Sequence, residues 1–472
     1  MKNHELVSLP IFELSKKIKS KELSVTELIQ STLEQIERLN PKINAFITVC
    51  SEEATKSAIL LDKEIQNSIY RGPLHGIPIG IKDIIDCEGI KTTFGSSMYT
   101  ENISKEDAEC SRRLKEAGAI IIGKCNTHEF AMGSTNKNPH YGPCKNPWDV
   151  TRVPAGSSGG SGASVAAHMC PGTLGTDTGG SVRGPAAICG TIGLKPTYGL
   201  ISLRGVHPNA TSLDHVGTLT RNAKDSAIIL QSIAGYDPKD SSSVNIPIPN
   251  YIDEIEKDIS QFRLIHCPDL IQTEIDSEIF SSFENSLKIL QDLGAKIETV
   301  NCPIASEINK YRKPIADAEL LSVHRENLEK SPEKFGEDVL ERLENAKYAS
   351  IDLYIEACKQ KVIIRRKMEE FLQGFDAIVL PGYPCVAAPI ETTMAEVNGK
   401  KVPFMGLSRD LTGPYNFVGF PAISVPSGFS KKEKLPMAIQ IVGMPYSEAH
   451  ILRIANAYES VTPEIRNIKP VL

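Results

Sequence analysis

The sequence predicts an α/β protein, and three observations carry that prediction. Residues 107–118 have the apolar spacing of an amphipathic helix and lead directly into the apolar run at 119–124, which is typical of a buried strand. Two later apolar runs, at 376–381 and 438–443, have the length of strands and lie among helical patterns. At 472 residues and 41% hydrophobic content, the chain fits two or three average domains or one large α/β domain.

The N-terminal part of the chain is expected to be mainly helical. Residues 10–39 have the pattern of two helices, and Ser24 with Glu27 forms a capping box at the start of the second. That helix is expected to stop before Pro41, because proline cannot continue the helical hydrogen-bond ladder. The next elements expected are a strand over 44–49 and a helix over 51–68.

Further elements follow along the chain. A strand-like run over 72–86 contains Lys82 among apolar neighbours. The remaining elements expected are helices over 223–234, 277–293 and 333–373 (the last broken into at least two), an extended segment over 246–249, and a closing helix over 450–460.

Composition narrows the class of protein. The net charge of −6 and pI near 6 argue against nonspecific binding to nucleic acid or to an anionic membrane. The N-terminus lacks the apolar core of a signal peptide, and no run approaches about 18 apolar residues. The eleven cysteines show no C-x-x-C pair and are expected to be buried free thiols. We therefore expect a cytoplasmic protein.

Two clusters rich in glycine and serine, at 156–160 and 175–181, mark the candidate active site. Glycine allows the backbone to approach a ligand closely, and successive N–H groups in such loops can converge on an anion. Ser181 directly follows Thr-Gly-Gly, so its hydroxyl would lie beside those N–H groups. A nucleophile next to an oxyanion pocket is the arrangement that acyl transfer needs.

The proton acceptor for Ser181 is expected to be Lys82. The ten histidines are scattered, and no G-x-S-x-G elbow surrounds the serine. Lys82 lies in an apolar run, and burial there would lower its pKa from about 10.4 by disfavouring the charged form. A neutral amine could then act as general base. The alternative is an exposed pair with Asp83, of little energetic weight.

Four motifs make this chain resemble the amidase signature family. They are Gly-Ile-Pro-Ile-Gly-Ile-Lys-Asp around Lys82, Gly-Ser-Ser-Gly-Gly-Ser around Ser157, Gly-Thr-Asp-Thr-Gly-Gly-Ser-Val-Arg around Ser181, and Cys-Gly-x-x-Gly-Leu-Lys-Pro-Thr-Tyr-Gly at 189–199. The resemblance extends from about Ser8 to Pro426. It implies one domain over 1–472, with a central, twisted, mixed sheet covered by helices on both faces, core motifs at 72–222 and a helical, pocket-forming part at 250–472.

The resemblance also implies a Ser-Ser-Lys relay. In it Ser181 attacks a carbonyl and forms an acyl-enzyme, Ser157 passes the proton on, and Lys82 is the terminal base. The peptide bond entering Ser157 is expected to be cis. Neither a metal nor a cofactor is expected, because the chain has no H-E-x-x-H and no clustered ligand set. The candidate oxyanion hole consists of the N–H groups of Thr178, Gly179, Gly180 and Ser181.

Residues next to the relay have expected supporting roles. Ser158 is expected to hold its loop by hydrogen bonding. Asp177 and Arg183 flank the nucleophile either as a pair that fixes the loop or as an ordinary salt bridge, and both alternatives stay open. His128 and Trp148 are expected to be structural.

By the same resemblance, the substrate pocket should be lined by a loop at 126–136, and above all by Ala131, Met132, Gly133 and Ser134. A second segment, at 402–419, should return to it. The side chains expected there are mainly apolar or aromatic: Phe130, Ala131, Met132, Phe404, Met405, Tyr415 and Phe417. They favour a small, mostly uncharged amide, or a related ester or carbamate such as a urethane, with weak discrimination.

Two functions within the family remain open. The main prediction is a stand-alone hydrolase of small amides, which could be a homodimer, with no nucleic-acid or membrane partner. The alternative is the glutamine-hydrolysing A subunit of a tRNA-dependent amidotransferase, which would need partner subunits. That function would also need a basic residue for glutamine, for which Arg365, Arg366 and Arg409 are the candidates. The region 336–343 resembles stand-alone amidases more closely.

Two hypotheses lie outside hydrolytic enzymes. A nucleotide-binding module is disfavoured, because neither cluster has G-x-x-x-x-G-K-[ST] or a clean G-x-G-x-x-G after a strand. A catalytically inactive scaffold is disfavoured, because Lys82, Ser157 and Ser181 are all present. Covalent labelling by a serine-reactive fluorophosphonate would separate a hydrolase from both.

Overall fold

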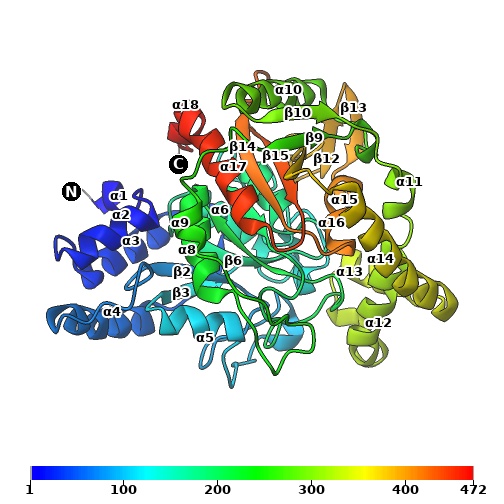
Figure 1. Cartoon of the computed structure of the whole chain (residues 1–472). Helices are drawn as coiled ribbons and strands as arrows, with labels where there is room; N and C mark the ends of the chain where they lie inside the picture. The colour runs from blue at the N-terminus through cyan, green and yellow to red at the C-terminus, as the bar shows by residue number, and fades with distance from the viewer. Residues whose placement is uncertain (1–2, 471) are drawn as a thin grey trace.

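A single mixed β-sheet forms the centre of the computed structural model, which describes residues 3–470 and 472, without the side chains of residues 3, 4, 466 and 467 (Figure 1). Eleven strands lie in this order across the sheet: β1 (Phe46–Val49), β3 (Ile120–Cys125), β2 (Pro78–Lys82), β6 (Gly172–Thr176), β8 (Val216–Thr220), β7 (Ile192–Lys195), β14 (Ala422–Phe429), β15 (Pro436–Gly443), β11 (Ala377–Pro381), β9 (Arg263–His266) and β10 (Lys296–Thr299). β2 is parallel to β3 and β6, and β9 is parallel to β10 and β11, whereas the other pairs are antiparallel. The predicted α/β class and mixed sheet are confirmed.

The expected strands are found, with changes in length. The strands predicted over 44–49, 119–124, 376–381 and 438–443 are β1, β3, β11 and β15. The run predicted over 72–86 yields only the five residues of β2. The chain leaves the sheet there because it turns at Lys82, whose carbonyl accepts the N–H groups of Ile84 and Ile85.

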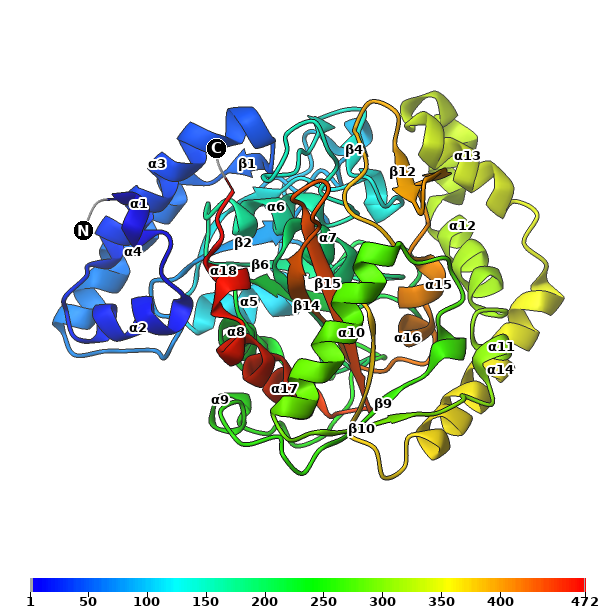
Figure 2. The ribbon, with the colours of Figure 1, turned by 90° about the horizontal axis from the view of Figure 1, so that it is seen from above.

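Helices cover both faces of the sheet. α6 (Gly159–Ala166) and α7 (Arg183–Cys189) pack on one face, while α8 (Ala223–Ile233), α10 (Ser277–Asp292) and α17 (Glu448–Val461) pack on the other; Figure 2 shows α10 and α17 beside β14 and β15. Alternate side chains of a strand point to opposite faces. Along β6, a side chain at Gly172 would meet Ile229 of α8, whereas Thr173 Oγ1 donates to the Ser161 carbonyl of α6 at 3.2 Å.

The small residues of α6 let this helix lie directly on the sheet. A Cβ at Gly160 would come within 2.4 Å of the Asn126 carbonyl oxygen and 2.5 Å of that of Ala45. Glycine is therefore required at this close approach. The packing places the start of α6, and with it Ser157, against the ends of β1 and β3.

The N-terminal helices lie at one side of the molecule, and the expected end of one of them is wrong. α2 (Ile11–Lys19), α3 (Val25–Ile43) and α4 (Ser51–Gln66) match the predicted helices, and Ser24 caps α3 by accepting from the Glu27 N–H at 3.1 Å. α3 passes through Pro41 and ends two residues later, with Asn44 in the left-handed region (φ 57°). Proline in the last turn removes one hydrogen bond and leaves the helix intact up to that point.

The C-terminal half adds a second helical group at the opposite side (Figure 1). The stretch predicted over 333–373 forms two helices, α13 (Glu337–Ala346) and α14 (Ile351–Phe371), which pack on α12 (Arg312–Lys330). The segment at 246–249 is in no helix or strand. The other elements are α1 (Asn3–Leu6), α5 (Glu109–Glu116), α9 (Tyr251–Glu254), α11 (Ala305–Ile308), α15 (Arg409–Thr412), α16 (Pro414–Phe417), α18 (Pro463–Asn467) and two small hairpins, β4 (Lys137–Asn138) with β5 (Gly142–Pro143) and β12 (Met394–Val397) with β13 (Lys400–Pro403).

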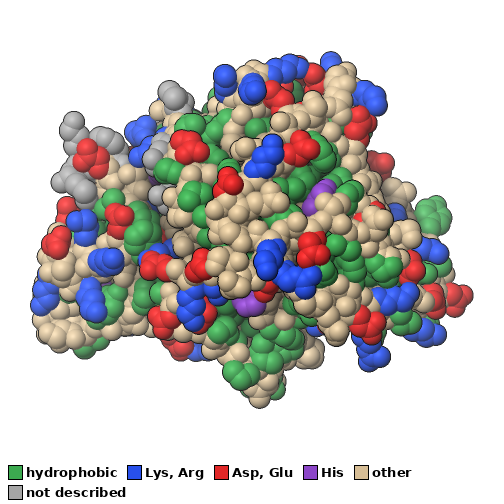
Figure 3. Space-filling model, turned by 45° about the horizontal axis from the view of Figure 1, so that its top comes forward, with side chains coloured by type: hydrophobic (Ala, Val, Ile, Leu, Met, Phe, Trp, Pro, Cys, Tyr) green, Lys and Arg blue, Asp and Glu red, His purple; other side chains and the backbone are tan. Residues whose placement is uncertain are grey.

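The charge distribution on the surface and the state of the cysteines are as the composition indicates. Acidic and basic side chains alternate over the face that Figure 3 shows. All eleven cysteines are free thiols, and all but Cys358 are buried, as expected. Within residues 3–470, no helix has both the length and the apolar character needed to cross a membrane.

Candidate active site

Lys82 ends β2 and is the buried centre of the candidate site. Its side chain has no exposed surface, and Nζ donates to Ser157 Oγ at 2.7 Å and to Thr176 Oγ1 at 2.8 Å. Thr176 ends β6, the parallel neighbour of β2, so the carboxyl ends of both strands meet at this edge of the sheet. The alternative of an exposed pair with Asp83 is wrong, because that carboxyl is also buried and its Oδ1 lies 3.6 Å from Lys124 Nζ.

The environment of Lys82 favours its neutral form. Burial lowers the pKa of the Lys82 ammonium to about 7, and the charges of Asp177 and Asp214 only partly oppose this effect. A lysine with a pKa near 7 has a large neutral fraction at neutral pH. Since its Nζ already contacts Ser157 Oγ, it can accept a proton from that hydroxyl.

The backbone places the loops of the two candidate serines, Ser157 and Ser181, next to each other. The Gly156–Ser157 peptide bond is cis, as the resemblance implied. The Ser157 carbonyl accepts from Thr127 Oγ1 at 3.0 Å and from the His128 N–H at 3.1 Å, which fixes the serine against the loop after β3. The next N–H, of Ser158, donates to the Ser181 carbonyl at 3.3 Å.

Ser158 supports this loop. Its hydroxyl donates to the Thr176 carbonyl and accepts from the Thr176 N–H, both at 3.2 Å. The side chain therefore ties the start of α6 to the end of β6. It acts on the loop and points to β6, as expected for a supporting residue.

The loop at 178–181 supplies three free N–H groups rather than four. Gly180 has φ 124°, and its N–H donates to Asp177 Oδ1 at 2.7 Å. The expectation that Gly180 belongs to the oxyanion hole is therefore wrong, because its one N–H group already donates to Asp177. Among the described residues, no acceptor is assigned to the N–H groups of Thr178, Gly179 or Ser181, which remain the candidate donors.

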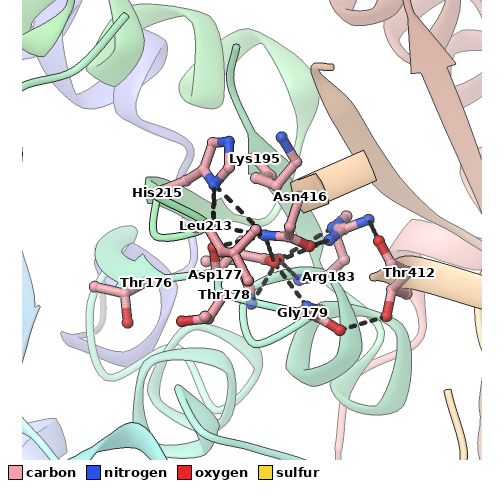
Figure 4. A network of polar contacts seen from close by, with 12 residues as sticks. Thr176, Asp177, Thr178, Gly179, Arg183, Lys195, Leu213, His215, Thr412 and Asn416 are labelled. Carbon is pink, nitrogen blue, oxygen red and sulfur yellow. Dashed lines mark hydrogen bonds and ion pairs between the residues drawn. The ribbon is translucent and has the colours of Figure 1, made fainter. Parts of the chain in front are cut away.

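Asp177 and Arg183 form the buried network that holds this loop (Figure 4). Arg183 Nη2 lies 2.9 Å from Asp177 Oδ1, and Asn416 Nδ2 donates to the same carboxylate oxygen at 2.9 Å. Asp177 also accepts the N–H groups of Gly180 and Val182. Burial alone would raise the pKa of the Asp177 carboxyl, but Arg183 and Asn416 hold it well below its usual range. Of the two alternatives, the structure supports the pair that fixes the loop.

Replacing Asp177 with asparagine should destabilise the protein strongly. The change keeps the side-chain volume and leaves the buried Arg183 guanidinium without its counter-charge, which typically costs about 3–5 kcal/mol. Urea unfolding followed by far-UV circular dichroism should show a clearly lower midpoint. The matched control is Glu52→Gln, which breaks the exposed pair with Lys56 and should leave the midpoint unchanged. Equal midpoints for the two variants would contradict the role given to Asp177.

A cavity opens in front of Ser181 at the carboxyl edge of the sheet. Three of the four residues expected to bind substrate line it, whereas Met132 is 3% exposed and does not. The lining residues are Ala131, Gly133, Ser134, Gly156, Thr178, Gly179, Gly180, Ser181, Asn209, Arg312, Ala316, Arg342, Gly406, Ser408 and Arg409. The predicted loops at 126–136 and 402–419 therefore both reach the cavity.

The expected aromatic lining is wrong, and of the seven side chains expected there only Ala131 lines the cavity. Phe130, Phe404, Tyr415 and Phe417 are at most 1% exposed and pack into the hydrophobic cores behind the cavity. Met405 is 38% exposed, but its sulfur accepts from Ser134 rather than lining the cavity. A sequence cannot show which aromatic side chains of a loop turn inward, and here the core takes them.

Three arginines take the place of those side chains. Arg312 is only 9% exposed, its Nη1 is 3.8 Å from the position of a Cβ at Gly179, and within the described chain its Nε has no hydrogen-bond partner. Arg342 Nη1 donates to the Met132 carbonyl at 3.2 Å, and Arg409 is exposed. Burial, with the charge of Arg409, lowers the pKa of Arg312 to about 9 and that of Arg342 to about 10.

Of the basic candidates considered from the sequence, only Arg409 lines the cavity. Arg365 instead pairs with Glu369 at 2.9 Å on α14. Arg312 and Arg342 were missed, because neither belongs to a motif. Arg312 lies outside the helices expected from the sequence, whereas Arg342 lies within the stretch expected over 333–373. The one usable signal was the position of Arg342 in the C-terminal third, where a basic residue was expected.

His128 and Trp148 have structural contacts, as expected. His128 Nε2 lies 2.8 Å from Asp338 Oδ2, and its ring fills the space beside Gly133. Trp148 Nε1 donates to the Cys189 carbonyl at 2.8 Å, and its ring packs against Phe429.

Comparison with known proteins gives one family over almost the whole chain. A family model described as Amidase matches residues 27–452. The A subunit of the glutamyl-tRNA(Gln) amidotransferase of Carboxydothermus hydrogenoformans is 37% identical, and the match covers 99% of this chain and 100% of that protein. The protein of the same name from Geobacter sp. strain M21 is 38% identical, with 97% of this chain and 98% of that protein covered.

Solved structures of similar fold include several different enzymes. One is described as a vestigial protein complex that reveals the origins of an s-triazine catabolic enzyme, with a TM-score of 0.92, 30% identity and coverage of 96% of this chain and 99% of that chain. The A subunit of glutamyl-tRNA(Gln) amidotransferase from Thermotoga maritima has a TM-score of 0.80 and 35% identity, covering 97% and 96%. A 6-aminohexanoate cyclic dimer hydrolase with its substrate has a TM-score of 0.87 and 26% identity, covering 98% and 99%.

Proposed function

Because this chain belongs to the amidase signature family, whose members act on carbon–nitrogen bonds other than peptide bonds, we propose that it hydrolyses a small amide that carries a carboxylate. The observation that carries this proposal is the buried Arg312 guanidinium beside the loop that ends at Ser181, whose Nε has no hydrogen-bond partner within the described chain. A buried cation without a direct ion pair is costly. The charges of Asp410 and Asp317 favour the charged form of Arg312 only in part, and a substrate carboxylate would supply a direct partner. The planar donors of arginine suit a carboxylate.

The proposed reaction begins at Ser181. Its Oγ forms a bond to the amide carbon, while its proton passes to Ser157 Oγ and the proton of Ser157 passes to neutral Lys82. The carbonyl oxygen, now negatively charged, accepts N–H groups of the 178–181 loop. When the C–N bond breaks, the proton returns from Lys82 through Ser157 to the leaving nitrogen, which would be a poor leaving group without it.

The second half of the reaction releases the acid. Water attacks the acyl ester on Ser181 and gives a proton to the same relay, and the ester bond breaks to regenerate the hydroxyl. The same steps apply to esters and carbamates, including urethanes, because the relay recognises a carbonyl and a leaving group. Substrate choice would therefore depend on the arginines of the cavity rather than on the relay.

Replacing Arg312 with glutamine should raise KM for a carboxylate-bearing amide at least tenfold and leave the hydrolysis of a neutral amide of equal length unchanged. The reason is that only the charged substrate loses its partner. The measurement is steady-state ammonia release from succinamate, glutaramate and pentanamide. The free energy of unfolding should not fall, because the variant removes a buried cation whose Nε has no hydrogen-bond partner within the described chain.

The matched control for Arg312 is Arg366→Gln, on the exposed side of α14. This variant removes an equal charge outside the cavity and should leave both substrates unaffected. Equal loss on the neutral and the charged amide in the Arg312 variant would contradict carboxylate binding. A clear loss of stability would instead assign Arg312 a structural role.

The names of the similar proteins favour a second candidate, the release of ammonia from glutamine within a tRNA-dependent amidotransferase. Proteins that are 37% identical over nearly the whole of both chains carry the name of its A subunit. This finding supports the second candidate better than it supports the uncharged small amide expected from the sequence. Glutamine carries a carboxylate, so Arg312 would suit it also.

The two candidates differ in what the purified chain does alone. A stand-alone hydrolase should release ammonia from a carboxylate-bearing amide with no other protein present. A component of an amidotransferase should act on glutamine, with a rate that rises when its partner proteins are added. The names of those similar proteins include tRNA. That this chain works without nucleic acid or partner proteins therefore remains a prediction. Gel filtration of the pure chain tests whether it forms a homodimer.

A further inference from the structure

The cavity in front of Ser181 holds more positive charge than one carboxylate would neutralise. Arg312, Arg342 and Arg409 all line it, and no lining residue in the described part of the chain is a carboxylate. Building on the proposed function above, we propose that the cavity accepts carboxylate-bearing amides that lack an ammonium group, and that Arg409 is the residue that disfavours the ammonium. Amino-acid amides such as glutamine would then be poor substrates.

The carboxylates around the arginines are outside the cavity, and three of the four are engaged by other groups. Asp214 is buried, Asp338 lies on α13 and Asp317 on α12, while Asp410 is exposed on α15 next to Arg409. Asp214 accepts from Thr178 and from the N–H groups of Asn209 and Ala210. Asp338 contacts His128, and Asp317 pairs with Lys313. An ammonium group in the cavity would therefore find no acidic partner on its walls.

An amino-acid amide brings its ammonium group on the carbon next to the carboxylate. If Arg312 binds that carboxylate, the ammonium must lie close to the remaining guanidinium groups. Like charges at such a distance repel each other. The same amide without the amino group makes the carboxylate contact and meets no repulsion. A substrate with a second carboxylate in place of the ammonium could contact a second arginine of the cavity.

Arg409 is the arginine of the three that can be changed with least effect on the fold. It is exposed at the start of α15, and no hydrogen bond or ion pair of its side chain is assigned within residues 3–470. Its Cζ lies 3.3 Å from the position of a Cβ at Gly406, whose N–H donates to Ser134 Oγ at 2.9 Å. Arg409 therefore belongs to the wall that faces the predicted substrate loop.

The test compares pairs of amides that differ only in the amino group. The pairs are glutaramate with L-glutamine and succinamate with L-asparagine, and pentanamide is the neutral reference. Ammonia release gives kcat/KM for the full-length wild-type chain, for Arg409→Gln and Arg409→Glu, and for the control Arg366→Gln. We expect wild type to prefer the amino-free member of the better pair at least tenfold. Arg409→Glu should reduce that preference at least tenfold, Arg409→Gln should lie between, and the control should match wild type.

The outcomes separate this inference from the proposed function. Equal or better use of glutamine or asparagine by wild type overturns the inference and leaves the carboxylate proposal standing. The same holds if the preference is real but unchanged in Arg409→Glu, since another group then rejects the ammonium. Failure of every carboxylate-bearing amide to exceed pentanamide, in protein whose Ser181 still reacts with a fluorophosphonate, overturns the proposed function itself.

Discussion

Replacing Ser181 with alanine should abolish turnover and leave the fold intact. In hydrolases with a comparable relay, removal of the nucleophile lowers kcat by about 10⁴- to 10⁶-fold. Ser181 is half-buried, and within the described chain no hydrogen bond is assigned to its hydroxyl, so its loss removes no structural contact. The measurements are kcat/KM on the best carboxylate-bearing amide and covalent labelling by a fluorophosphonate, which should disappear.

Ser158→Ala is the control for this experiment, because it removes a neighbouring hydroxyl of equal size. It should still be labelled by the fluorophosphonate and should lower stability through the lost contacts with Thr176. Retention of even a tenth of wild-type activity in Ser181→Ala would correspond to a loss of only about 1.4 kcal/mol and would exclude the serine as nucleophile.

The position of the candidate site could be predicted, because its residues belong to short local patterns in the sequence. Lys82 ends a five-residue strand whose other residues are isoleucine, glycine and proline, and such an apolar run favours burial. The glycines around Ser157 and Ser181 signal close backbone contacts, and the structure shows those contacts at Gly160 and Gly180. Helices with regular apolar spacing, such as α5 and α10, could be placed for the same reason.

Other elements carry no such signal. β6 and β8 contain glycine and threonine, β7 is only four residues long and contains glycine, and the short helices α6 and α7 consist mainly of small residues. The sequence therefore shows neither the two-residue alternation of a strand nor the 3.6-residue spacing of an amphipathic helix in these segments. Their formation depends on the sheet that they complete. The arginines of the cavity could not be predicted for a further reason. Arg312, Arg342 and Arg409 come from three separate helices, and only the packing of α12, α13 and α15 brings them together.

The positive charge of the cavity limits what sequence similarity implies about the substrate. The backbone and the relay would serve glutamine and other amides equally, because they contact the carbonyl and the leaving group alone. Discrimination between substrates therefore depends on side chains that belong to no motif. Two proteins that are 37% identical over their whole length can therefore share the chemistry of Ser181 and differ in the substrate that reaches it.

Replacing Lys82 with methionine should lower kcat/KM by about 10²- to 10⁴-fold, the usual contribution of a general base, and should remove the pH dependence described next. Methionine is nearly isosteric and apolar, so it fits the fully buried position, although Thr176 and Ser157 lose a partner. Far-UV circular dichroism and urea unfolding check that the variant is folded. Activity within a few-fold of wild type would show that another group accepts the proton.

The activity of the wild type should rise with pH. Burial disfavours the ammonium form and lowers the pKa of Lys82 to about 7, so the neutral base is lost as the pH falls below that value. We expect log kcat/KM to rise with a slope near one up to about pH 7 and then to level off. A flat profile from pH 5 to pH 9 with chemistry rate-limiting would argue against a lysine base.

A second group titrates in the same range and must be separated from Lys82. Burial raises the pKa of the Asp214 carboxyl to about 6, although Thr178 Oγ1 donates to it at 2.6 Å. The negative charge of Asp214 raises the pKa of Lys82, so Asp214→Asn should move the inflection to lower pH while keeping it. If Asp214 itself were the titrating group, the inflection would vanish in this variant and persist at low activity in Lys82→Met. The two variants together therefore assign the base.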